Sequence, residues 1–104
     1  MVIRLGVILP SCNTLLETEL CSLPINGVSF HFTRVVNYLD TEEELAAMAG
    51  QAPNVAELLS HAKVHAIAFG CTGGSFLYGK GYDLELIKKM ASRVTVPCIT
   101  PPQQ

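Results

Sequence analysis

Four apolar runs, separated by more polar segments, predict the strands of this chain. They cover residues 2–9, 28–36, 64–69 and 94–100. The first and third runs are apolar almost throughout, which is typical of strands that are covered on both faces of a parallel sheet. The second run alternates and contains aromatic and β-branched residues, which also favours a strand. Pro97 in the last run indicates an edge strand, because proline donates no hydrogen bond to a neighbouring strand.

The segment between the first two runs predicts a helix. It covers 14–22, with Asn13 or Thr14 as the N-cap. After the second run, Thr41 and Glu44 have the spacing of a capping box and predict the start of a second helix.

The second helix should bend near Gly50 and Pro53 and resume through Leu59, since proline removes a helical hydrogen bond. After the third run, Asp83 is expected to cap a third helix that ends near Arg93.

Strands that alternate with helices define the fold class as α/β. We expect one domain, residues 1–104, with a doubly wound, four-stranded parallel sheet and right-handed crossovers. The expected strand order is the flavodoxin-like 2-1-3-4. In that order ligands bind between the first and third strands, beyond their carboxyl ends.

Composition excludes several classes of protein. Hydrophobic residues make up 49% of the chain and charged residues 15%, which argues against disorder. A formal charge of −2 predicts no binding to nucleic acid or to an anionic membrane. The apolar start is short and ends in a Pro-Ser-Cys-Asn turn, so it is interpreted as a strand rather than a signal peptide. A cytoplasmic protein with reduced thiols is expected.

The loops after the first and third strands carry the candidate chemistry. Both combine small polar side chains with backbone amides at a helix start, an arrangement that binds carboxylate or phosphate. The candidate binding residues are Ser11, Asn13, Thr72 and Ser75. Local capping of the helices is an equally good interpretation of Asn13, Thr72 and Ser75.

Cys71, in the second of these loops, is the candidate reactive residue. A helix start and the absence of an acidic neighbour favour the thiolate, which acts as a nucleophile or as a base. An inert buried thiol is the alternative. Cys12 is open to both interpretations, whereas Cys21 and Cys98 are expected in the core. Arg34 is interpreted as a solvated surface residue, although it lies where it could reach an anion.

Metal and nucleotide sites are not favoured. Cys12, Cys71 and Cys98 could converge, but tetrahedral zinc usually takes ligand pairs that are closer in sequence. Neither G-x-G-x-x-G nor the P-loop spacing occurs.

Three segments resemble the maleate cis-trans isomerases of the aspartate/glutamate racemase superfamily. They are GVILPSCNTLLE (residues 6–17), TEEELAAM (41–48) and FGCTGGSFLYGKGYD (69–83). The resemblance extends almost to Thr100 and covers the N-terminal half of such a protein. It implies a cofactor-independent enzyme for a small carboxylate, with two similar α/β halves that face each other and commonly supply one cysteine each.

The resemblance also implies roles for individual residues. Cys71 would be the first-half cysteine that attacks the alkene carbon of maleate, and Asn13 would hold a carboxylate with support from Thr72 and Ser75. The superfamily's decarboxylase lacks a cysteine at the position of Cys71, which favours an isomerase or a racemase. Cys12 stands where serine is usual.

Three functions remain open. They are a maleate isomerase-like enzyme, a racemase of an Asp/Glu-type amino acid, and a truncated domain that binds a carboxylate or assembles without turnover. The resemblance implies that the second half, with its own cysteine, is absent. We expect a homodimer or higher oligomer, in which a second copy replaces that half and brings two Cys71 residues across one cleft.

Overall fold

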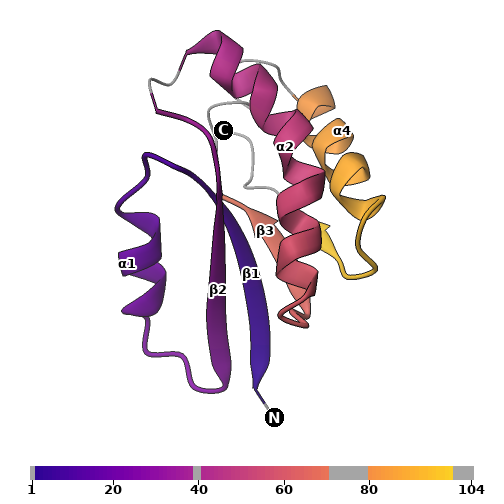
Figure 1. Ribbon diagram of the computed structural model, residues 1–104. Helices are drawn as coiled ribbons and strands as arrows, with labels where there is room; N and C mark the ends of the chain where they lie inside the picture. The colour runs from indigo at the N-terminus through magenta and orange to yellow at the C-terminus, as the bar shows by residue number, and fades with distance from the viewer. Residues whose placement is uncertain (1, 39–40, 71–79, 100–104) are drawn as a thin grey trace.

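The computed structural model describes residues 2–38, 41–70 and 80–99. Within these ranges the strands form one parallel sheet of order β2-β1-β3-β4 (Figure 1). The strands are β1 (Ile3–Pro10), β2 (Val28–Val35), β3 (Ala66–Phe69) and β4 (Cys98–Ile99). The predicted strand order and the edge position of the last strand are confirmed.

The helices lie on both faces of this sheet. Helices α2 (Glu42–Ser60) and α4 (Lys80–Ala91) lie side by side on one face, and the short α1 (Leu16–Cys21) lies on the other (Figure 1). The doubly wound α/β class is therefore confirmed. None of the described helices is both long enough and apolar enough to cross a membrane.

The main core lies between the sheet and the pair α2 and α4. Ile8 of β1 is fully buried in it, and the approach of β1 to α2 is close at Gly6, where an added Cβ would be 3.0 Å from Leu59 Cδ1. Val7 and Leu9 are also buried, but they point to the opposite face, because successive side chains of a strand alternate. Burial on both faces explains why this strand is apolar almost throughout. The buried apolar residues of the main core are Ile8, Val35, Met48, Ala52, Ala56, Leu59, Val64, Ile67, Phe69, Leu86, Met90 and Val94.

Two helix boundaries differ from the prediction. Helix α1 begins at Leu16 rather than at residue 14, because the chain first turns around the side chain of Asn13. Helix α4 begins at Lys80, so Asp83 lies inside its first turn and is not the cap.

Helix α2 begins where the sequence predicts and runs without a break to Ser60. Thr41 Oγ1 accepts a hydrogen bond from the amide of Glu44 at 3.2 Å, as a capping box requires. The helix then continues through Gly50 and Pro53 as one element, so the helix does not resume after a break there, and the predicted bend stays a prediction. The buried Ala52 beside Pro53 shows that this part of α2 packs into the core, and packing outweighs the cost of the proline.

Candidate functional site

The first candidate loop is a tight turn at the carboxyl end of β1. The amide of Asn13 donates to the carbonyl oxygen of Pro10 at 3.0 Å, which closes the turn. The amide of Ser11 donates to the carbonyl oxygen of Val35 at 2.8 Å, which ties the turn to the end of β2. The loop is therefore held against the sheet at the end where the strand order reverses.

Both predicted binding residues of this loop also have structural roles. Ser11 Oγ accepts a hydrogen bond at 2.9 Å from the backbone amide of Asn37, which is a buried residue. Asn13 Oδ1 accepts from the amides of Leu15 and Leu16, at 3.1 and 2.9 Å. Asn13 thus caps two amides at the entry to α1, but the N-cap position of the helix is Leu15 and not Asn13 or Thr14. The Nδ2 group of Asn13 and the hydroxyl proton of Ser11 remain the donors that these side chains can offer to a ligand.

Arg34 contacts the same loop, which the sequence interpretation missed. Its Nη1 donates to the carbonyl oxygens of Pro10, Ser11 and Asn13, at 3.2, 3.4 and 2.8 Å. Its Nη2 donates to Glu17 Oε1 at 2.8 Å. The side chain is therefore exposed, as the sequence predicts, but it is also a structural contact of the loop. The strand register indicates this contact, because Arg34 of β2 pairs with Leu9, the residue that precedes Pro10.

The second candidate loop begins beside the first. The amide of Gly70 donates to the carbonyl oxygen of Ile8 at 2.7 Å, and an added Cβ at Gly70 would be only 2.8 Å from Leu16 Cδ2. Leu16 is the first residue of α1, and its amide donates a hydrogen bond to Asn13 Oδ1. The chain thus leaves β3 in contact with the start of α1, as the topology predicts.

Three of the predicted site residues follow Gly70 and lie outside the described residues. They are Cys71, Thr72 and Ser75. Their roles stay predictions.

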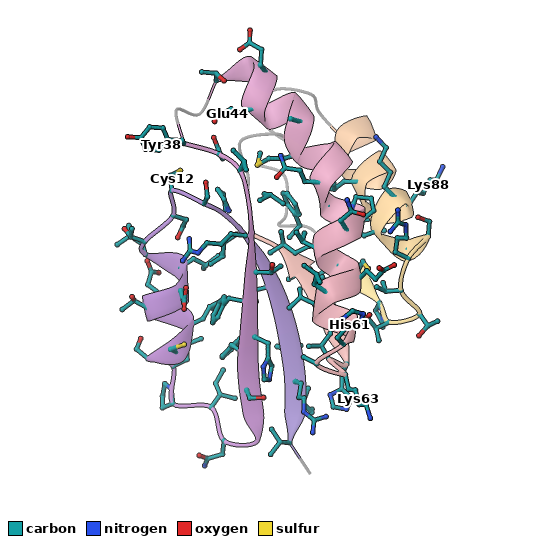
Figure 2. All side chains as sticks on the ribbon, viewed as in Figure 1. Cys12, Tyr38, Glu44, His61, Lys63 and Lys88 are labelled. Atoms are coloured by element: carbon teal, nitrogen blue, oxygen red, sulfur yellow. The ribbon has the colours of Figure 1, made fainter. Side chains whose placement is uncertain are left out.

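The described cysteines differ in environment. Cys12 is exposed in the first loop, and Figure 2 shows it at the opposite end of the molecule from His61 and Lys63. Cys21 is also exposed, so its predicted core position is wrong. The reason is that α1 is short and buries none of its residues. Cys98 packs partly against the core, and this burial raises the pKa of its thiol.

An open groove of about 700 Å³ runs from the first loop along α1. The ion pair of Glu17 and Arg34 lies on its wall. The groove is lined by Ser11, Asn13, Thr14, Glu17, Thr18, Cys21, Ser22 and Arg34. Among the described residues, no three His, Cys, Asp or Glu side chains come together as metal ligands.

Comparison with known proteins relates the chain to one kind of enzyme. A maleate isomerase of Pseudomonas putida is 33% identical over an alignment of 95 positions, and the match covers 84% of this chain and 38% of that protein. A maleate isomerase of Geobacillus stearothermophilus is 31% identical over an alignment of 97 positions, and the match covers 86% of this chain and 39% of that protein. The chain therefore spans about two-fifths of the length of these relatives. No family model matches the chain.

Solved structures show the same relationship. A mutant of the Nocardia farcinica maleate cis-trans isomerase, with a covalently bound succinylcysteine intermediate, has a TM-score of 0.81 and 25% identity. The match covers 95% of this chain and 44% of that chain. A liganded mutant of arylmalonate decarboxylase has a TM-score of 0.82 over 95% of this chain and 42% of its own, at 21% identity, and so shows the fold alone.

The chain shares its 2-1-3-4 sheet with proteins of the racemase-like α/β superfamily, among them the Nocardia farcinica maleate cis-trans isomerase. Within this superfamily, the chain is similar to the N-terminal half of the maleate isomerases.

Proposed function

We propose that this chain carries one half of the catalytic machinery of a cofactor-independent isomerase for a small carboxylate. The conversion of maleate to fumarate is the first reaction to test. The observation that carries the proposal is the contact of Gly70 with Leu16, because it brings the residue before Cys71 beside the loop of Ser11 and Asn13. The relatives named maleate isomerases support the choice of substrate.

In the proposed mechanism Cys71 is the nucleophile. Its thiolate sulfur bonds to one alkene carbon of maleate, and the π electron pair moves to the other carbon and its carboxylate. Rotation about the resulting single bond places the carboxylates on opposite sides. The electron pair then returns, the carbon–sulfur bond breaks, and fumarate and the thiolate are released. A succinylcysteine in the Nocardia farcinica relative is a covalent adduct of the kind this step requires.

Asn13 and Ser11 are proposed to bind one carboxylate of the substrate. The Oδ1 atom of Asn13 faces the amides of Leu15 and Leu16, so the Nδ2 group on the same planar amide is directed away from them. The hydroxyl of Ser11 accepts from Asn37 and keeps its proton to donate. Thr72 and Ser75 are the proposed partners from the second loop.

Chemistry on both faces of the substrate needs a second set of groups. Three apolar side chains beside the first loop are strongly exposed: Leu15 at 68%, Val36 at 58% and Tyr38 at 77%. Exposed apolar surface of this kind favours burial against another protein surface. We propose that a second copy of the chain covers this surface and supplies its own Cys71. A monodisperse monomer by light scattering at high protein concentration would overturn this pairing.

The decisive experiment follows maleate and fumarate by proton NMR. The Cys71→Ser variant should lose turnover, whereas Cys21→Ser, which changes an exposed thiol at the end of α1 that lies away from the first loop, should keep it. Equal activity in both variants would defeat the assignment of Cys71. A panel of small amino acids in D₂O tests the racemase alternative, since α-proton exchange without maleate turnover would select it. If no acid shows turnover or α-proton exchange, the remaining interpretation is a domain that binds a carboxylate or assembles without turnover.

A further inference from the structure

Arg34 forms more hydrogen bonds to the first loop than any other described side chain. It bonds three carbonyl oxygens of residues 10–13 and the carboxylate of Glu17. We propose that Arg34 is a positioning residue, which orients the backbone amides of Cys12 and Thr14 toward a substrate carboxylate. This inference rests on the proposed function and adds a binding element that the sequence did not predict.

The geometry of the peptide group supports this role of Arg34. In a trans peptide the C=O of one residue and the N–H of the next point in opposite directions. Because the carbonyl groups of Ser11 and Asn13 point at the guanidinium, the amides of Cys12 and Thr14 point away from it. Arg34 thus fixes the direction of two successive donor groups without touching either one.

The other amides of the loop are already used. Ser11 donates to Val35 and Asn13 donates to Pro10. The amides of Cys12 and Thr14 donate to no acceptor in the part of the chain that the structure describes. They are therefore the backbone donors that this loop can offer to an anion, beside the Nδ2 group of Asn13.

Arginine is the residue type that this role requires. A guanidinium is planar and carries five N–H donors in a fixed arrangement, so it can serve several acceptors from one position. Lysine has the same charge but presents it as a compact ammonium on a flexible stem. Glu17 pairs with Arg34 at 2.8 Å, which holds the guanidinium in place and offsets its charge. The proposed recognition of the carboxylate is thus by amides and not by Arg34 itself.

The variant Arg34→Lys distinguishes the positioning role of Arg34 from direct binding of the anion by Arg34. If Arg34 were the anion ligand, Arg34→Lys would keep a cation at the site and most of the affinity for maleate. If Arg34 positions the loop, Arg34→Lys should weaken binding about as much as Arg34→Ala does. Arg93 gives a matched control, since it forms a comparably exposed ion pair with Glu57 at 3.3 Å on the helix pair α2 and α4.

The experiment titrates the full chain with maleate and follows backbone ¹⁵N–¹H spectra. All proteins carry Cys71→Ser, so that maleate is not consumed. With Arg34 intact, the amides of Cys12 and Thr14 should shift on binding. In Arg34→Ala and Arg34→Lys these shifts should be lost and the Kd for maleate should rise about tenfold. Arg93→Ala should bind as the parent does.

Chemical rescue tests positioning apart from folding. Millimolar guanidinium should restore maleate binding in Arg34→Ala and leave Arg93→Ala unchanged. Circular dichroism checks that each variant is folded. If Arg34→Ala is unfolded, the Kd of Arg34→Lys for maleate decides the test.

Two results would overturn the inference while the proposed function stands. They are binding of maleate by Arg34→Lys with the parent's affinity, and binding by the parent without a shift at Cys12 or Thr14. Absence of maleate binding by the parent would overturn both proposals.

Discussion

Gly70 and Leu16 are in such close contact that no side chain fits between them. An added Cβ at Gly70 would lie 2.8 Å from Leu16 Cδ2 and 3.2 Å from the carbonyl oxygen of Ile8. The contact joins the end of β3 to the start of α1. Through it, the chain leaves β3 beside the entry to α1.

Replacement of this glycine should therefore weaken the fold. We expect Gly70→Ala to lower the free energy of unfolding by about 1–3 kcal/mol, because the Ile8 oxygen belongs to the backbone of β1 and cannot move aside. Urea unfolding measures the change. Gly50 is the control, since nothing lies within 4 Å of an added Cβ there. Gly50→Ala should raise stability by about 0.5–1 kcal/mol, as expected inside a helix. Equal effects of the two substitutions would show that the Gly70 contact is unimportant.

Asn13 allows its two roles to be separated. Asn13→Ala removes the oxygen that caps α1 and should cost about 1 kcal/mol of stability. Asn13→Asp keeps a capping oxygen and should retain stability, but it replaces the amide donor by a negative charge. Both variants should bind maleate more weakly, as measured by calorimetry. Binding by Asn13→Asp at the original affinity would leave Asn13 with the capping role alone.

The hydroxyl of Ser11 should contribute to stability through Asn37. In Ser11→Ala the amide of the buried Asn37 loses the Ser11 acceptor, at a cost of about 1–3 kcal/mol. Ser92 is a suitable control, because its hydroxyl bonds the carbonyl oxygen of Lys89 at an exposed helix end. Ser92→Ala should change stability by less than about 0.5 kcal/mol. Thermal unfolding of the pair tests this, and a neutral Ser11→Ala would contradict it.

The thiol of Cys98 should be the slowest of the three described thiols to react. Burial raises its pKa above the ordinary 9.0, so less thiolate forms at a given pH, whereas Cys12 is exposed. Mass spectrometry after brief treatment with iodoacetamide at pH 8 should find Cys12 modified before Cys98. Faster modification of Cys98 would contradict this prediction.

The same raised pKa makes stability depend on pH at the alkaline end. The folded state holds the Cys98 proton more tightly than the unfolded state does, so the contribution is complete below pH 9.0 and is lost as the pH rises from there through the folded-state pKa. Urea unfolding between pH 8 and pH 10 should show this decline in the parent and a smaller decline in Cys98→Ser. An identical dependence in both would contradict the link.

The sequence by itself determined the sheet. Apolar runs separated by helical segments specify strands and helices locally, and the rule that βαβ crossovers are right-handed restricts how the strands are arranged. For these reasons the order 2-1-3-4 could be predicted, and with it that β1 and β3 are neighbours. Thr41 and Asn13 could be predicted as capping residues because capping depends on neighbours a few residues away.

Only the tertiary structure decided which face of each element is buried and what Arg34 contacts. Cys21 lies on a helix that buries none of its residues, so a helical pattern alone could not place it. Arg34 reaches Pro10 and Asn13 because the register of β2 on β1 sets it beside the turn. Such a contact joins segments more than twenty residues apart, and no local pattern encodes it, since it forms only when the whole sheet is assembled.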